Sequence, residues 1–329
     1  MTGTRAKAFP LTIGLLMALV LVPGCARPTP AEPFEGTLAI YHAGSLAVPF
    51  EEMTVEFNKL YPNVEIVRDS GGSRSEIRKI IELGKTADIL ASADYALIPD
   101  MMFPEFADWY IAFAHNQMVI CYTDQSRFKD EINKDNWYEI LASDGVVYGH
   151  SDPDQDPCGY RTLMVWQLAE NYYKEFGMYK SLDIDDTHKN MTRPKSVDLI
   201  ALLESGDLDY AFEYLSVARQ HDLKYVELPA QIDLSSAEFE DFYATAKVAV
   251  SGKEPGTKTT LTGKPIVYGF TIPQNASRPD LAVIFLKFLL SEDGQAIMER
   301  NGQPPIAPAL TNDRTKLPGE LRDLCVEAK

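Results

Sequence analysis

The chain has 329 residues, of which 45% are hydrophobic, and its formal net charge at pH 7 is −17. This length suits about two domains of roughly 100–200 residues each. So acidic a chain repels nucleic acids and anionic membrane surfaces, which argues against both as partners. It also repels anionic ligands at long range, so any anion site must rely on local dipoles rather than on net charge.

Residues 1–24 predict a signal peptide, because a short basic stretch precedes an apolar run, "LTIGLLMALVLV", that is too short to span a bilayer. Gly24 followed by Cys25 resembles a bacterial lipoprotein signal, in which the cysteine becomes the lipidated first residue. A plain secretory signal with an incidental cysteine is the alternative. Residues 25–35 contain three prolines and predict a semi-extended tether to the folded body.

From residue 36 onward, predicted strands alternate with predicted helices. The strands are "TLAIYHA" (37–43), "NVEIVRDS" (63–70) and "ADILASAD" (87–94), and the helices begin at residues 46, 73 and 95. Helices between strands indicate β-α-β units, which build parallel sheets. Such sheets bind ligands beyond the carboxyl ends of their strands, where the following helices begin.

The long run 109–123, "WYIAFAHNQMVICYT", predicts a strand that crosses from one lobe to another. A second α/β region follows, with strands at 145–152 and 208–216 and helices at 157–176 and 196–206. After a variable loop, the strand 264–273 and one long helix over 278–302 are expected to return to the first lobe. We therefore predict an α/β protein with two lobes and a ligand cleft between them: lobe one comprises 36–116 plus 217–329, and lobe two comprises 117–216.

Three strand-to-helix junctions share one chemistry. They are "YHAGSLAVPF", "RDSGGSRSEI" and "YGHSDPDQDPCGYRTL", each rich in Gly, Ser or Asp. The first turn of a helix has backbone N–H groups without partners, and the helix dipole adds partial positive charge there. Serine hydroxyls add donors, and glycine lets a ligand approach the backbone closely. One such junction is usually only a helix cap, but three, split between two lobes, predict a shared anion site.

Other site chemistries find less support. Dinucleotide and P-loop glycine motifs are absent, and no cluster of His and Cys has metal-ligand spacing. Three cysteines, Cys121, Cys158 and Cys325, remain after Cys25; their odd number argues against a disulfide framework, although one pair could bridge. The acids around Asp156 lack the glycine and closing glutamate of an EF-hand. Asp156 is also suited to cap the helix that opens with Pro157.

Five segments resemble the molybdate/tungstate-binding proteins of ABC importers, in particular the tungstate branch. They are "IYHAGSLAVPFEEM", "SGGSRSEIRKI", "ADILASADYALIP", "DPCGYRTLMVWQLAE" and "DYAFEYLSVARQH", and the resemblance spans nearly all of residues 37–310. It implies a periplasmic-binding-protein-like fold that closes on one oxyanion and delivers it to a membrane permease. It implies no catalysis and no cofactor, a monomer, and a lipid-anchored extracytoplasmic location.

The resemblance also implies a set of ligand-binding residues. Ligand-binding residues are expected from the first lobe and the second lobe alike: Gly44, Ser45, Ser73, Pro157, Cys158, Ser196 and Tyr214, of which all but Pro157 can donate a hydrogen bond. Asp156 corresponds to an acid that approaches the metal atom of the oxyanion in the tungstate branch. That branch has a second acid at the position of Ser196, which puts coordination by two carboxylates in doubt here.

Two alternative functions stay open at this point. The first is a binding protein for another ligand, such as sulfate, phosphate or ferric iron. The second is a serine-dependent hydrolase, although no junction serine lies in a G-x-S-x-G or S-x-x-K motif. His42 and His150 neighbour two of the junctions, and we interpret both as structural residues.

Overall fold

The computed structural model describes residues 1–3, 34–184, 189–254 and 256–328. By its internal contacts the chain divides into Met1–Pro33 and Phe34–Lys329. Residues 4–24 of the expected signal peptide, Cys25 and almost all of the tether lie outside the described residues. The account below concerns the second unit. No helix among the described residues has both the length and the apolarity that a membrane span requires.

A seven-stranded mixed sheet forms the centre of what we call lobe one. Its strand order is β14-β13-β4-β12-β3-β1-β2, with β1 parallel to both β2 and β3. The strands are β1 (Gly36–Ala43), β2 (Val64–Gly71), β3 (Ile89–Ser92), β4 (Ile111–His115), β12 (Val267–Thr271), β13 (Pro305–Thr311) and β14 (Cys325–Glu327). The helices are α1 (Ala47–Leu60), α2 (Ser73–Ile81), α3 (Leu97–Met102), α10 (Pro279–Leu289), α11 (Glu292–Arg300) and α12 (Gly319–Arg322).

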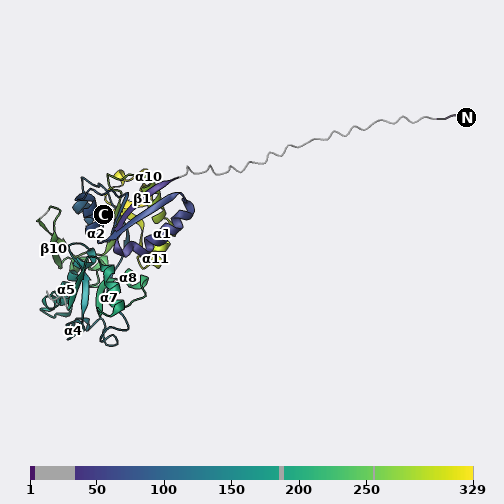
Figure 1. Ribbon diagram of the computed structural model, residues 1–329. Coiled ribbons are helices and arrows are strands. Elements are labelled where there is room, and N and C mark those ends of the chain that lie inside the picture. Colours follow the sequence, from purple (N-terminus) through teal and green to yellow (C-terminus); the bar gives the residue numbers. More distant parts are fainter. Residues whose placement is uncertain (4–33, 185–188, 255, 329) are drawn as a thin grey trace. The chain divides into compact units, whose positions relative to one another are not determined.

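A five-stranded sheet forms the centre of lobe two, with the order β7-β6-β8-β5-β9. Its strands are β5 (Met118–Tyr122), β6 (Tyr148–Ser151), β7 (Asn190–Arg193), β8 (Tyr210–Tyr214) and β9 (Lys224–Glu227). The helices of this region are α4 (Trp137–Ala142), α5 (Pro157–Tyr173), α6 (Met178–Leu182), α7 (Leu199–Ser205) and α8 (Leu215–Gln220). Figure 1 shows α1, α2, α10 and α11 gathered around one sheet and α4, α5 and α7 around the other. The expected architecture of two α/β lobes is confirmed.

Short elements join these layers. A small antiparallel pair of strands, β10 (Lys247–Ser251) and β11 (Lys258–Thr262), follows α9 (Glu240–Tyr243). The single-turn 3₁₀ helices are η1 (Gly44–Leu46), η2 (Ser196–Asp198), η3 (Ala237–Phe239) and η4 (Arg314–Lys316). The strand pair and α9 lie in the stretch for which the sequence predicted only a variable loop.

The run 109–123 crosses between the lobes as expected, but as two strands rather than one. It breaks at Asn116–Gln117, so β4 pairs within the first sheet and β5 pairs within the second. The return crossing comes later than residue 216, because β9 still pairs with β5. β12 then pairs with β3 and β4 in lobe one.

The long helix expected over 278–302 is two helices, α10 and α11. Leu290 ends the first, and Ser291 caps the second by accepting a hydrogen bond from the Gly294 N–H. A serine in extended backbone conformation before two acids is a strong helix start, so it divides an apolar pattern that otherwise reads as continuous. The break lets both helices pack against α1.

Candidate functional site

The three predicted junctions exist in the structure. β1 leads through η1 into α1, β2 leads into α2 after Gly72, and β6 leads into α5. A fourth junction, from β7 through η2 into α7, begins at Ser196. All four follow strands that have a parallel neighbour, so the helices start at the carboxyl edges of the two sheets.

Two close approaches between the lobes bring the junctions together. A Cβ added to Gly44 of lobe one would lie 3.2 Å from a methyl carbon of Val197 in lobe two. A Cβ added to Gly72 would lie 2.4 Å from the Gln155 carbonyl oxygen and 3.1 Å from Asp156 Cβ. Ser45 and Ser73 therefore face the segment of lobe two that carries Asp156 and Ser196, and all four residues are buried.

Backbone hydrogen bonds hold the lobes together at this point. The carbonyl oxygen of Gln155 accepts hydrogen bonds from the N–H groups of Arg74 and Ser75, at 3.1 and 3.2 Å. Two amides of the first turn of α2, which have no partner within the helix, are therefore used in the contact between the lobes. The guanidinium of Arg74 donates to the Asp154 and Ser251 carbonyl oxygens, and that of Arg78 donates to Asp154 as well. The two lobes are therefore in direct contact at these junctions.

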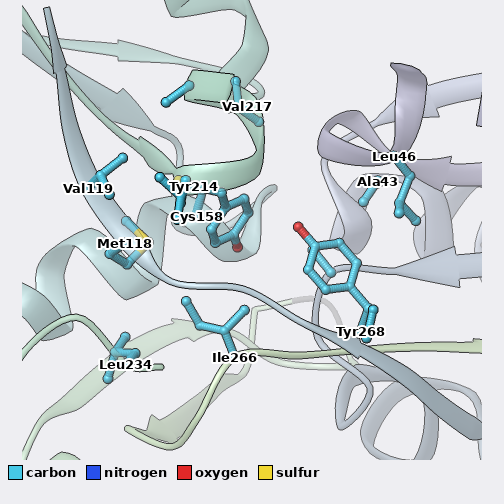
Figure 2. Close-up of a cluster of buried hydrophobic side chains, with 14 of the residues drawn as sticks. Ala43, Leu46, Met118, Val119, Cys158, Tyr214, Val217, Leu234, Ile266 and Tyr268 are labelled. Carbon is cyan, nitrogen blue, oxygen red and sulfur yellow. The ribbon is translucent and has the colours of Figure 1, made fainter. Parts of the chain in front are cut away.

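Two tyrosines complete one wall. The Tyr268 hydroxyl lies 2.7 Å from Ser45 Oγ, and it accepts a hydrogen bond from Asn116 Nδ2 at 2.9 Å. The Tyr214 ring stands 6.2 Å from the Tyr268 ring, centroid to centroid. Figure 2 shows the hydroxyl ends of the two tyrosines facing one another from opposite lobes. The wall thus joins β12, which carries Tyr268, to β8, which carries Tyr214.

Three hydroxyls of the site share one bonding pattern. Ser73 Oγ accepts a hydrogen bond from the Ala93 N–H at 3.0 Å, and the Tyr214 hydroxyl accepts one from Arg161 Nη1 at 2.7 Å. The Tyr268 hydroxyl accepts from Asn116 in the same way. A hydroxyl has one proton to donate, and the bond from behind leaves that proton available at Ser73 and Tyr214, whereas the bond between Tyr268 and Ser45 uses the proton of one of those two hydroxyls. The wall therefore has hydroxyl donors to offer a ligand.

Asp156 caps α5 as the sequence predicted. Its carboxyl accepts from the Cys158 N–H at 3.0 Å and from the Ser196 N–H at 2.9 Å. Pro157 is the first helical residue, where its missing N–H is harmless. Burial raises the pKa of Asp156 to about 6, although the two backbone bonds and Arg161 oppose the rise. The Cys158 N–H already donates its hydrogen bond to Asp156, so a hydrogen bond from this N–H to a ligand stays a prediction.

The cysteines and histidines near the junctions have structural roles in this arrangement. Cys121, Cys158 and Cys325 are free thiols, and burial raises the pKa of all three. Nδ1 of His42 and of His150 is hydrogen bonded to the carbonyl oxygen of the next residue in each case. Burial lowers the pKa of His42 to about 4 and that of His150 in the same direction, so both imidazoles are neutral. The described part of the chain contains no group of three or more His, Cys, Asp and Glu side chains that could hold a metal ion.

Sequence reasoning missed several residues of this site. Tyr268 and Asn116 lie in segments that the sequence predicts only as strands, and their partners are at least 100 residues away in the chain. Arg161 follows the third junction, and its buried contacts with Ala93, Asp94 and Tyr214 join segments more than 50 residues apart. Local sequence patterns predict the junctions. The positions of these side chains depend instead on contacts with residues far away in the chain, which no local pattern records.

The geometry describes a two-lobed protein with buried hydroxyl groups gathered where the lobes meet, as a ligand-binding protein requires. The family model for bacterial extracellular solute-binding proteins matches residues 38–303, and the chain belongs to that family. Membership implies a location outside the cytoplasm.

Two relatives illustrate the likeness in sequence. A solute-binding protein from Petrotoga mobilis is 53% identical over 293 residues, which cover 89% of this chain and 91% of the relative. The molybdate/tungstate-binding protein WtpA of Pyrococcus abyssi is 42% identical over 329 aligned residues, covering 90% of this chain and 94% of the relative.

Solved structures show the same fold at low identity. The periplasmic molybdate-binding protein of Azotobacter vinelandii superposes with a TM-score of 0.54 at 18% identity, covering 81% of this chain and 98% of that one. The sulfate-binding protein SubI of Mycobacterium tuberculosis has a TM-score of 0.59 at 11% identity, covering 83% and 88%. These likenesses support the fold alone.

Asp156 makes a pH-dependent contribution to stability that can be measured. The folded protein holds the Asp156 proton more tightly than the unfolded chain does, so the protonated carboxyl favours folding. This stabilisation is complete below about pH 4 and is lost as the pH rises through about 6. We expect the free energy of unfolding of the ligand-free protein, relative to that of Asp156→Ala, to fall by about 2 kcal/mol between pH 4.5 and 8. Urea denaturation at several pH values checks this, and a constant difference would contradict it.

Proposed function

We propose that this protein captures tungstate or molybdate outside the cytoplasm and delivers it to the permease of an ABC importer, without catalysing a reaction. The observation that carries the proposal is the set of buried hydroxyls, Ser73 and Tyr214 among them, that each accept a hydrogen bond from behind. Each leaves a proton to donate toward a ligand that is rich in oxygen atoms. The name of the Pyrococcus relative, at 42% identity, supports tungstate and molybdate among possible oxyanions.

The proposed ligand set contains donors from both lobes. Ser45, with the amide of Gly44, and Ser73 belong to lobe one; Ser196 and Tyr214 belong to lobe two. Pro157 and Cys158, at the start of α5, line the proposed site, and the Cys158 N–H would have to leave Asp156 in order to donate to the ligand. Hydrogen bonds to charged groups contribute on the order of 1.5–3 kcal/mol each, so several preorganised donors suit tight capture. We propose that the Asp156 carboxylate contacts the tungsten or molybdenum atom of the oxyanion. The sulfur atom of sulfate does not accept such an additional oxygen ligand.

The alternatives are weaker on the same observations. A hydrolase needs a base beside the nucleophile, but His42 and His150 are buried and each has Nδ1 bonded to a backbone carbonyl. Another tetrahedral oxyanion would satisfy the same donors, so the choice among ligands depends on cavity size and on Asp156. No resident cofactor is proposed, because the oxyanion is cargo.

The ligand and its residues are tested together by isothermal titration calorimetry with tungstate, molybdate and sulfate. We expect the parent to bind tungstate and molybdate much more tightly than sulfate. Ser45→Ala and Ser73→Ala should each weaken tungstate binding by roughly 10- to 100-fold, the loss of one charged hydrogen bond. The exposed Ser205→Ala is the matched control and should bind like the parent. If both site variants bind as the parent does, the assignment fails.

Closure of the lobes around the ligand depends on Gly72. Its added Cβ would meet the backbone of Gln155 at 2.4 Å, which no side-chain movement can relieve. We expect Gly72→Ala to weaken tungstate binding at least tenfold and to leave a larger radius of gyration in saturating ligand, measured by small-angle X-ray scattering. Gly319→Ala is the control, because nothing lies within 4 Å of its added Cβ. Equal radii for Gly72→Ala and the parent would contradict this role.

We also propose that Cys25 carries a lipid and that the protein acts as a monomer anchored by the tether. The sequence around Cys25 is the support for this, and it lies outside the described residues. The full-length protein should fractionate with membranes and release a diacylglyceryl-modified Cys25 peptide detectable by mass spectrometry. Cys25→Ser should remove the modification; a parent protein with an unmodified Cys25 would refute the anchor.

A further inference from the structure

Glu213 is a buried acid that the proposed ligand set does not use. It lies on β8 directly before Tyr214, and its backbone pairs with Val119 of β5. Its side chain is 0% exposed, and neither carboxyl oxygen has a hydrogen-bond partner in bonding geometry. A buried polar group without a partner costs stability, so its presence in the wall of the site requires an explanation.

The surroundings of Glu213 disfavour a negative charge. Burial raises its pKa well above the usual value, and the charge of Asp156 raises it further, with Asp198 acting in the same direction. The Ser196 side chain and the Tyr214 backbone are the polar groups near enough to oppose the rise. Glu213 is therefore held as a neutral carboxylic acid, with one O–H to donate.

Asp156 and Glu213 thus have opposite environments within one site. Asp156 accepts two backbone N–H groups, which favour its ionised form. Glu213 accepts none in bonding geometry, so of the two neighbouring acids it is the one that retains a proton. Ser196 lies between them, because its N–H donates to Asp156 and its side chain acts on Glu213.

We propose that Glu213 is a positioning residue of the oxyanion site: its neutral carboxyl donates to the Ser196 hydroxyl and directs the Ser196 proton toward the ligand. The inference rests on the proposed function. It extends a pattern already present at three other hydroxyls, where Ala93 donates to Ser73, Arg161 to Tyr214 and Asn116 to Tyr268. Glu213 would supply Ser196 with a donor from behind of the same kind.

This role suits an acidic protein that binds an anion. A cation behind Ser196 would also orient its hydroxyl, but it would pair with Asp156 and compete for that carboxylate. A neutral acid orients the hydroxyl without adding charge of either sign. Because it acts only through Ser196, its effect on the ligand must disappear when the Ser196 hydroxyl is removed.

The test is a double-mutant cycle measured by calorimetry with tungstate at one pH. We expect Glu213→Leu and Ser196→Ala each to weaken binding about tenfold, and the double variant to bind no more weakly than Ser196→Ala alone. Glu213→Gln should stay within about threefold of the parent, because its amide N–H₂ can donate as the carboxylic acid does. Ligand-free Glu213→Leu should be at least as resistant to urea as the parent, because an unpartnered carboxyl is replaced by an apolar side chain.

Several results would overturn the inference. Parent-like binding by Glu213→Leu, or losses that multiply in the double variant, would show that Glu213 does not act through Ser196. A Glu213→Gln variant as weak as Glu213→Leu would show that a charged carboxylate, not a donor, is needed. Glu213→Met replaces Glu213→Leu in the cycle if the leucine variant does not fold. Failure of the parent and of all variants to bind tungstate would remove the proposed function together with the inference, whereas parent binding with an unaffected cycle removes the inference alone.

Discussion

A hydroxyl has a single proton to donate, and a hydrogen bond accepted from behind leaves that proton for a ligand; this constraint organises the site. Ser73, Tyr214 and Tyr268 each accept from a group behind them. The chain carries a net charge of −17, so it cannot attract an anion by its overall field. Oriented hydroxyls act at short range, where the distant acids of the surface are screened by solvent and salt.

The charged residues of the site are arranged so that little net charge remains. The Arg161 guanidinium donates to Tyr214 and Ala93, and Nη2 lies 3.5 Å from an Asp94 oxygen, which also accepts from the Tyr160 hydroxyl. Asp156 is held by two amides at the start of α5 and at Ser196. Arg161 Nη2 is buried without a hydrogen-bond partner among the described residues, which favours a ligand that supplies several strong acceptors at once.

The sequence was informative where chemistry and local structure coincide. Gly44, Ser73 and Asp156 stand at strand-to-helix junctions, and such junctions are visible in the sequence because a period of two gives way to a period near four. The structure has those junctions and brings them together.

The sequence does not reveal the distant partners of these residues. Tyr268 lies 223 residues from Ser45 and 152 from Asn116, and no local pattern records such pairs. The fold was predictable at the same level, since the two lobes were expected, but the capping Ser291 and the later return of the chain after β9 were not.

Asn116 sits at the break between β4 and β5, where the chain leaves one sheet for the other. Its Nδ2 donates both to Ser216 at the start of α8 and to the Tyr268 hydroxyl on β12, at 2.8 and 2.9 Å. A single amide therefore ties the connecting strand, one lobe and a wall of the site to each other. A rotation of one sheet relative to the other about Asn116 would stretch one of its two hydrogen bonds. The orientation of the Tyr268 hydroxyl is therefore coupled to the angle between the two lobes.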